Sequence, residues 1–109
     1  MEKIVCKNDG WNVVKQFEGW TLGILRYCER FSKCTELERH LLTDEVFVLL
    51  AGEVSLLIGR EMKEYKLEPG KIFNVKAATW HQLQMSEDAK VLIVENLNTG
   101  RANSEYMDI

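Results

Sequence analysis

The sequence predicts an all-β protein, an antiparallel sandwich or barrel in a single domain. Turn-forming groups such as Asn8-Asp9-Gly10, Gly59-Arg60 and Glu68-Pro69-Gly70 divide the 109 residues into short pieces. No window of ten or more residues carries the three-and-four apolar spacing of an amphipathic helix. A chain of this length can bury one core, and no repeat or proline-rich linker interrupts it. We therefore expect one domain over residues 1–109.

Nine segments between the turns are strand candidates. Lys63–Leu67 alternates between two faces, as expected of a strand with one wet side. Val46–Leu50 is apolar on both faces, which predicts a strand that is covered on both sides. Glu29–His40 is the nearest candidate for a helix, but Ser32-Lys33-Cys34-Thr35 within it is poor helix material. The nine strand candidates are Val13–Phe17, Thr21–Tyr27, Thr35–Leu41, Glu45–Leu50, Ser55–Ile58, Lys63–Leu67, Lys71–Val75, His81–Met85 and Val91–Glu95.

The last segment of the chain differs from the rest. Asn96–Ile109 is rich in asparagine and contains Gly100. This composition predicts a turn-rich loop that is either laid over the barrel or frayed. The core of the domain is therefore expected at about residues 20–95, with residues 96–109 as a C-terminal loop segment.

Charge and cysteine content exclude several classes of function. The net charge is -3 and the 14 basic residues are scattered, so a nucleic-acid footprint is not expected. The longest apolar run, Val46–Ala51, is too short to span a membrane, and no signal segment opens the chain, which predicts a cytoplasmic protein. The three cysteines (Cys6, Cys28 and Cys34) form no Cys-x-x-Cys pair, so we expect free thiols without a disulfide framework.

The two histidines stand beside acids in the predicted strands. Glu38 and His40 fall on the same face of an extended segment. Glu45 opens the next strand after Leu41–Asp44, which is long enough for a hairpin-like connection that would place His40 and Glu45 side by side. His81 begins a distant strand. Two imidazoles and a carboxylate suit a divalent Fe, Mn, Ni, Zn or Cu ion, and Glu38 would add a fourth ligand.

The segment around these residues resembles the first motif of the cupin superfamily. In that motif a His-x-His pair precedes a Glu and a Gly, and here His40 precedes Glu45 and Gly52, with Glu38 at the place of the first histidine. The resemblance covers about residues 20–95. It implies a double-stranded β-helix, or jelly-roll barrel.

The second cupin motif is similar to Lys76–His81, with Gly70 at the place of its leading glycine. Carried over by position, the resemblance implies that His40, Glu45 and His81 are metal ligands. The pattern departs from the family at several places, because Lys76 stands for a proline, Ala78 for a glycine and Met85 for an asparagine. The exchange of imidazole for carboxylate at Glu38 would harden the site and add negative charge. The alternative is a metal-free pocket in which Glu45 is hydrogen-bonded to a histidine, with Glu38 merely on the wet face.

Four large apolar residues are candidates for the wall of this pocket, although such residues in a barrel are mostly core. Phe47 and Leu49 share the strand parity of Glu45 and should point inward with it. Arg39 and Lys76 are adjacent in sequence to candidate positions, so they should face solvent or a dimer interface. The four candidate lining residues are Phe47, Leu49, Phe73 and Trp80, and Trp20 is a further candidate.

Three function classes follow. The first is a small metal-binding cupin that binds or transforms a small polar molecule, such as a sugar or small carboxylate, although the resemblance chooses no reaction. The second is a metal-free, non-catalytic ligand-binding or sensing module. The third is a structural homodimer with a degenerate site. The resemblance also implies a homodimer, and the N-terminal residues Trp11, Val13, Val14 and Phe17 could supply the apolar face or fold onto their own barrel.

Overall fold

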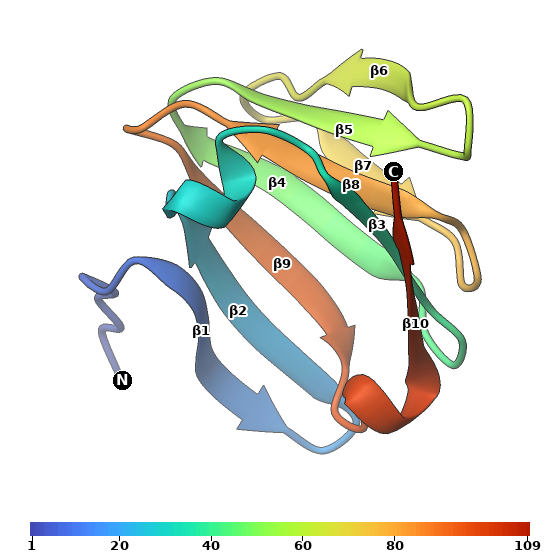
Figure 1. Ribbon diagram of the computed structural model, residues 1–109. Coiled ribbons are helices and arrows are strands. Elements are labelled where there is room, and N and C mark those ends of the chain that lie inside the picture. Colours follow the sequence, from blue (N-terminus) through green and yellow to red (C-terminus); the bar gives the residue numbers. More distant parts are fainter.

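The computed structural model describes residues 1–109 as two antiparallel five-stranded sheets that face each other (Figure 1). Sheet A has the strand order β1-β2-β9-β4-β7, and sheet B has the order β10-β3-β8-β5-β6. The all-β antiparallel barrel that the sequence predicts is thereby confirmed. The strands are β1 (Gly10–Phe17), β2 (Trp20–Arg26), β3 (Glu36–His40), β4 (Glu45–Ala51), β5 (Val54–Ile58), β6 (Lys63–Lys66), β7 (Ile72–Val75), β8 (His81–Met85), β9 (Lys90–Asn96) and β10 (Ser104–Asp108).

Helical structure is confined to two short 3₁₀ turns. These are η1 (Glu29–Phe31) and η2 (Arg101–Asn103). The turn η1 lies in the segment that came nearest to a helical pattern, and it ends at Phe31, whose side chain is buried. No helix in the structure is both long and apolar enough to cross a membrane.

Alternation along the central strands of sheet A decides which side chains face the interior. In β4 the side chains of Glu45, Phe47 and Leu49 are buried, which agrees with their predicted common face. The intervening Val46 and Val48 are only partly covered. The expectation of a strand covered on both sides is therefore met on the inner face and only partly on the outer face within one chain.

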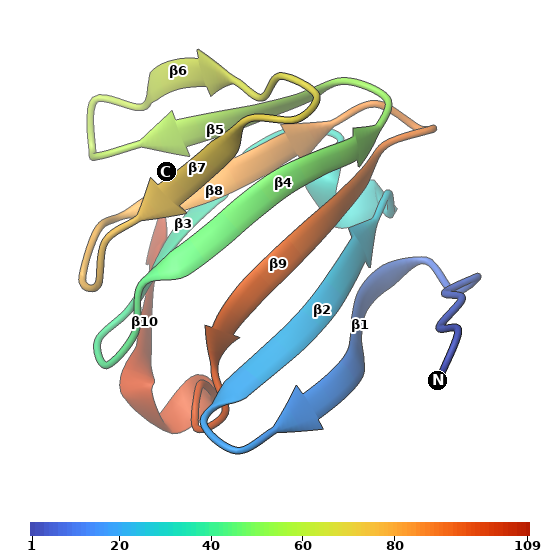
Figure 2. The same cartoon turned by 180° about the vertical axis from the view of Figure 1, so that it is seen from behind.

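The main core lies between the two sheets, and Figure 2 shows β4, β9 and β2 running side by side across sheet A. Phe47 and Val91 from sheet A are almost completely buried there. Burial of such side chains contributes on the order of 2 kcal/mol each to folding. The core residues are Leu25, Phe31, Phe47, Leu49, Val54, Leu56, Leu67, Val75, Leu83, Met85, Ala89, Val91 and Ile93.

The C-terminal segment corrects the predicted loop. After the turn η2, strand β10 pairs with the edge of β3 from Ser104 opposite His40 to Asp108 opposite Glu36. The side chain of Met107 packs against Leu37 and its neighbours on the outer face of sheet B. The strand, which has five residues, escaped prediction because it follows a run of turn-forming residues. Pairing with the otherwise open edge of β3 satisfies backbone groups that neither strand could satisfy alone.

Candidate functional site

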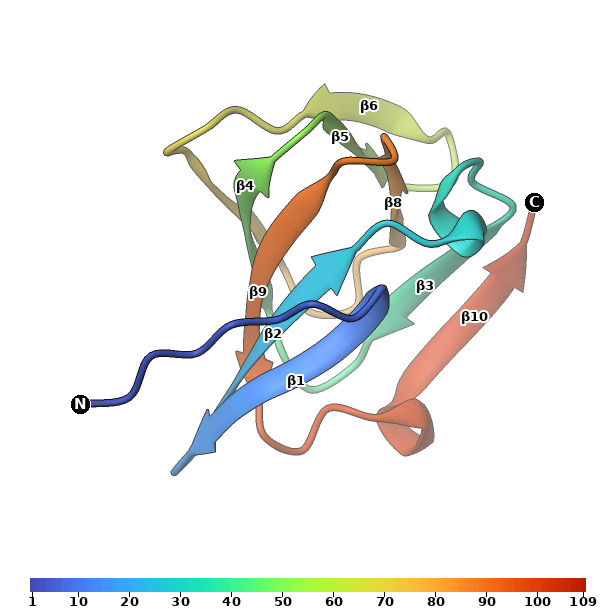
Figure 3. The same ribbon diagram turned by 90° about the vertical axis from the view of Figure 1, so that its left-hand side faces the viewer.

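A cavity of about 500 Å³ lies between the two sheets. The edge strands β1 and β10 border the same side of the sandwich (Figure 3), and each contributes to the cavity lining, β1 through Trp11 and β10 through Tyr106. Phe47 and Leu83 form part of its apolar wall. A cavity of this size is typical of small-molecule sites.

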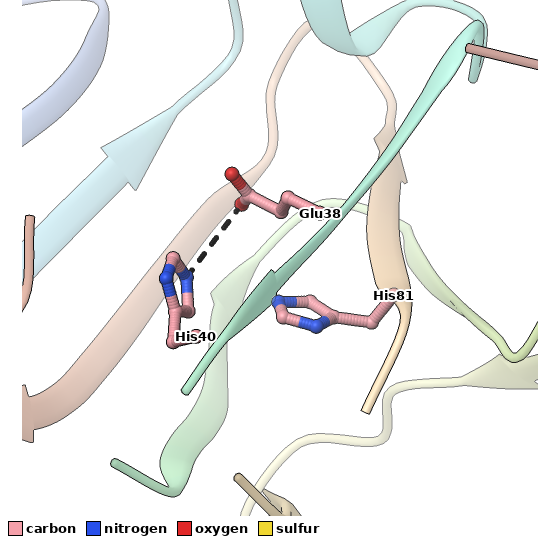
Figure 4. A group of neighbouring side chains, drawn as sticks. All are labelled: Glu38, His40 and His81. Carbon is pink, nitrogen blue, oxygen red and sulfur yellow. Dashed lines mark ion pairs between the residues drawn. The ribbon is translucent and has the colours of Figure 1, made fainter. Parts of the chain in front are cut away.

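The acids and histidines that the sequence singles out meet at this cavity. Figure 4 shows Glu38 and His40 on β3, with the His81 ring reaching toward them from β8. The Nε2 atoms of His40 and His81 lie 3.0 and 2.9 Å from Oε1 of Glu45. Oε1 of Glu38 lies 3.9 Å from Nε2 of His40. The structure thus brings all four candidate metal ligands together.

The connection between His40 and Glu45 is not the predicted hairpin. β3 belongs to sheet B and β4 to sheet A, so the residues between them cross from one sheet to the other. Thr43 in this crossing is buried, and its hydroxyl accepts a hydrogen bond from the backbone N–H of Asn96. His40 and Glu45 therefore meet face to face across the interior of the barrel, and they are not neighbours within one sheet.

Hydrogen bonds on the far side of each ring fix which nitrogen carries hydrogen. Nδ1 of His81 lies 2.9 Å from the carbonyl oxygen of Thr79, which can only accept, so Nδ1 of His81 donates. Nδ1 of His40 lies 2.7 Å from Oγ of Ser104. Because that hydroxyl donates its single hydrogen to the carbonyl of Gly100, it accepts from His40. In the neutral rings, both Nε2 lone pairs therefore face Glu45.

This arrangement fits a metal ion. With both rings neutral, Oε1 of Glu45 is buried without a hydrogen-bond partner, and two nitrogen lone pairs point at it. Three electron-rich atoms can share this space only with a proton or a cation between them. Adjacent ligand atoms of one octahedral ion, each about 2.1 Å from it, lie about 3 Å apart, which is the spacing found here. Outer hydrogen bonds that orient histidines in this way are usual at metal centres.

A fifth residue, Glu95, was missed by sequence reasoning. A carboxylate oxygen of Glu95, a ring nitrogen of His40 and a carboxylate oxygen of Glu45 all lie within 4.8 Å of one another. The ligand atoms of Glu38, His40 and His81 satisfy the same limit. The sequence carried a signal for Glu95, because this residue shares the inward face of β9 with Val91 and Ile93. A carboxylate on an otherwise apolar inner face is costly unless a charged or hydrogen-bonding partner compensates it.

Burial and mutual charge shift the pKa values of the central groups in the metal-free protein. Burial alone would raise the pKa of Glu45, but hydrogen bonds and positive charge from His40 and His81, when those rings are protonated, lower it to about 2. Burial disfavours protonation of both rings, yet the hydrogen bond and charge of Glu45 outweigh it and raise the pKa of His40 and of His81. In the metal-free protein Glu45 therefore keeps its negative charge to low pH, and both rings hold a proton to higher pH than a free imidazole does.

The pKa values of the two outer acids, Glu38 and Glu95, shift in the opposite direction to that of Glu45. Burial raises the pKa of Glu38 against the opposing charges of His81 and His40. Burial, together with the hydrogen bond and charge of Glu45, raises the pKa of Glu95 to about 8. Glu95 therefore retains its proton near neutrality when no metal is bound, and it can act as a hydrogen-bond donor.

These shifts predict how the stability of metal-free protein depends on pH. The lowered pKa of Glu45 contributes stability above its ordinary value of 4.5, and this contribution is lost as pH falls toward 2. The raised values of His40 and His81 contribute below 6.5 and are lost as pH rises past them. The raised pKa of Glu95 costs stability as pH rises from 4.5 toward 8. We therefore expect metal-free protein to melt at a higher temperature at pH 5.5 than at pH 8.5.

The measurement is thermal unfolding of chelator-treated protein across this range. Addition of metal should restore stability most strongly on the alkaline side, because the ligands must be deprotonated to bind. A melting temperature that rises steadily from pH 5.5 to 8.5 in metal-free protein would contradict this charge arrangement.

Only one of the predicted lining residues lies at the cavity wall in the structure. Phe47 lines the cavity, and its ring packs edge-on against His81 with centroids 6.0 Å apart. Leu49, Phe73, Trp80 and the further candidate Trp20 lie outside the lining. Leu49 is one step deeper on the inner face of β4, within the core, and Phe73 is half-buried against the edge of that core.

Trp80 faces away from the cavity for a simple geometric reason. It precedes His81, and successive side chains near a strand point to opposite faces. Its ring packs with the outer cluster of Leu37 and lies 4.5 Å from the guanidinium carbon of Arg39. Arg39 also donates a hydrogen bond to Glu105 on the same outer face. The same alternation that predicts an outward Arg39 applies equally to Trp80.

No protein-family model matches the sequence, and no curated protein matches it. Solved structures do match its fold. Streptomyces Pac13, a nucleoside dehydratase, superimposes with a TM-score of 0.74 at 6% identity over 97% of this chain and 86% of that one. A cupin-2 domain protein from Shewanella frigidimarina has a TM-score of 0.65 at 17% identity over 84% of each chain.

An iron(II) form of the protein HppE adds a third match, with a TM-score of 0.64 at 17% identity over 80% of this chain and 48% of that one. At these identities the matches establish the fold alone. They agree with the two facing five-stranded sheets and with the motif resemblance around His40, Glu45 and His81. The protein therefore has the cupin fold.

Proposed function

We propose that this protein is a small metal-binding cupin that binds or transforms a small polar organic molecule in the cavity between its sheets. One observation carries the proposal. The Nε2 atoms of His40 and His81, each oriented by an outward hydrogen bond, converge on the buried and unpartnered Oε1 of Glu45. Lone pairs that converge in this way repel one another unless a cation lies between them, and a bound metal ion would supply that cation.

The residues of the centre would have two roles, metal coordination and contact with the bound molecule. His40, His81, Glu45 and Glu38 would hold a divalent ion of Fe, Mn, Ni, Zn or Cu, which supplies Lewis acidity or redox chemistry when bound. Glu95 lines the cavity beside them and is placed to exchange a proton with a bound molecule. Phe47 covers one side of the centre and limits the access of water.

Neighbouring structures support the small-molecule part of the proposal. Pac13 is described as a nucleoside dehydratase, and its variants have been solved with uridine. HppE has been solved in an iron(II) form. A hydroxylated small molecule and a divalent metal are therefore both compatible with this barrel, although function does not follow from fold.

A second candidate is a metal-free acid–base or binding site. The lowered pKa of Glu45, between two histidines whose pKa values are raised, favours it, because the protons alone neutralise the centre. In that case Glu45 orients two cationic rings, and the protonated Glu95 donates to the ligand. The two candidates differ in one observable, the uptake of metal.

The experiment is calorimetric titration of metal-free, untagged protein with Mn²⁺, Fe²⁺, Ni²⁺, Cu²⁺ and Zn²⁺ at pH 7.5. We expect one ion per chain for at least one metal, with release of protons from the centre. Uptake of no metal above the level of a chelated control would reject the metal proposal and favour the metal-free site.

Ser104 provides a sharp test of how the centre is built. Its hydroxyl accepts the hydrogen bond of Nδ1 of His40, so replacement by alanine frees the ring to rotate and to change tautomer. We expect Ser104→Ala to weaken metal affinity by about tenfold or more. Glu105→Ala is the matched control, because this residue lies on the same strand and pairs outward with Arg39. Equal affinities in the two variants would show that Ser104 does not orient His40.

We also propose a homodimer, located in a reducing cytoplasmic compartment. Trp11 turns into the cavity of its own barrel, so pairing through that N-terminal residue is not favoured. The outer face of sheet A instead exposes Leu50 and Ile72, at 50% and 74%, and unpartnered apolar sheet faces of this kind are common dimer interfaces. The three unpaired cysteines suit a reducing compartment. Sedimentation analysis of the native protein and of a Leu50→Lys variant tests the pairing.

A further inference from the structure

Two aromatic residues stand at the border of the cavity on opposite sheets. Trp11 belongs to β1, the edge strand of sheet A, and Tyr106 belongs to β10, the edge strand of sheet B. Both line the cavity, and their side chains remain 43% and 39% exposed. Neither ring stacks on another aromatic ring. The two rings are thus accessible from the cavity and free to contact a ligand.

Gly23 fixes the position of Trp11. Gly23 is an inward-facing residue of β2, between the buried Thr21 and Leu25 on the same face. A Cβ atom at Gly23 would lie 1.9 Å from Cη2 and 2.2 Å from Cζ3 of Trp11. The indole therefore occupies the space that a side chain at position 23 would fill. A glycine inside a strand weakens the strand, and here it permits a close approach of this kind.

Tyr106 connects the border to the polar centre. In the register of sheet B it lies opposite Glu38, which in turn lies opposite His81. The guanidinium carbon of Arg101 lies 5.3 Å from the centre of the tyrosine ring and steadies it. Arg101 forms no ion pair and also lines the cavity. One row of residues therefore leads from an aromatic border with a free cation to the acids and histidines inside.

We propose that Trp11, held on Gly23, and Tyr106 form a ring-binding site, and that the ligand of this protein is a hydroxylated ring compound such as a sugar or a nucleoside. This inference rests on the proposed function and names its substrate class. An indole presents a large, rigid apolar face on which the flat face of a ring can stack at low entropic cost. The hydroxyl groups then reach Glu38, Glu95 and the metal ligands.

Charge sets the orientation of such a ligand. The inner part of the cavity carries Glu38, Glu45 and Glu95, whose carboxyl oxygens accept hydrogen bonds from hydroxyls. Arg101 is the cation available for an anionic substituent of the ring at the border. The ring therefore lies at the aromatic border with its hydroxyl-bearing edge inward.

The test uses the indole N–H signals of ¹⁵N-labelled protein, with Zn²⁺ and without it. Methyl β-D-glucopyranoside and uridine are the ring probes, and sorbitol is the open-chain control with comparable hydroxyl groups. We expect at least one ring probe to shift the Trp11 signal saturably, while sorbitol leaves it unmoved. The glucoside and the uridine titrations distinguish a sugar from a nucleobase as the stacking ring. Trp20, which is 41% exposed but outside the cavity lining, should not respond.

Variants separate stacking from folding. Trp11→Ala removes the indole, and Gly23→Ala displaces it. We expect each variant to weaken binding of the ring probe by about tenfold. Trp20→Ala should leave it unchanged, and all three variants should keep their zinc affinity. Unchanged ring affinity in both cavity variants, or no saturable binding of either ring probe by the native protein, would overturn the inference. Metal uptake by the native protein in that case leaves the proposed function standing, whereas a native protein that takes up none of the five divalent ions would count against the function alone.

Discussion

Replacing His81 with alanine is expected to abolish stoichiometric metal binding. His81 supplies one of the two Nε2 atoms that face Glu45, and its own Nδ1 is anchored by Thr79. Loss of a direct ligand should cost more than the 10- to 100-fold typical for an outer hydrogen bond, so affinity should fall by about 100-fold or more. Equilibrium dialysis with elemental analysis measures this directly.

The effect of the lost side-chain volume in His81→Ala must be separated from the effect of the lost metal ligand. His81 is almost fully buried, so alanine also leaves a cavity in the barrel wall. His81→Gln retains most of the volume and should lose metal equally. Gln82→Asn, at a buried neighbour whose side chain bonds to the backbone of Leu83, serves as the control. Full metal occupancy in a folded His81→Gln protein would show that this ring is not a ligand.

Replacing Gly52 with alanine is expected to cause a larger loss of stability than the same replacement at Gly70 or Gly19. Gly52 has φ of +73°, and an added Cβ would lie 2.6 Å from Cα and 2.7 Å from the backbone nitrogen of Ala89. The left-handed conformation alone costs a non-glycine residue about 1–2 kcal/mol. The contact with backbone adds to this because the neighbouring chain must move.

Two other glycines make the comparison quantitative. Gly70 also has positive φ, at +76°, but an added Cβ would meet nothing within 4 Å. Gly19 has open space and no positive φ. Chemical denaturation of the three alanine variants should show a loss of free energy of unfolding in the order Gly52, Gly70, Gly19, with Gly19→Ala close to the native protein. Equal losses at Gly52 and Gly70 would show that the backbone beside Ala89 yields freely.

The parts of the fold that the sequence predicts are those with local signals. Turn residues and alternation locate nine strands, and the parity of Glu45, Phe47 and Leu49 correctly places all three inside. The tenth strand is specified by a long-range contact, the open edge of β3, and its own residues resemble a turn. The path between His40 and Glu45 is similarly non-local, because nothing in Leu41–Asp44 shows that the chain changes sheets there.

The candidate site follows the same division. Glu38, His40, Glu45 and His81 could be selected from motif spacing, and the structure gathers them at one cavity. Glu95 lies outside both motifs, and it reaches the centre because β9 pairs with β4. Ser104 was hidden in the segment predicted as loop. Residues that orient a ligand are chosen by three-dimensional packing, so spacing along the chain carries little information about them.

Anomalous diffraction from crystals grown with the preferred metal tests the central claim most directly. The account predicts a single strong peak within bonding distance, about 2.1 Å, of Nε2 of His40, Nε2 of His81 and a carboxylate oxygen of Glu45. A metal peak found only at the protein surface, with the two rings hydrogen-bonded to Glu45 and no density between them, would contradict it.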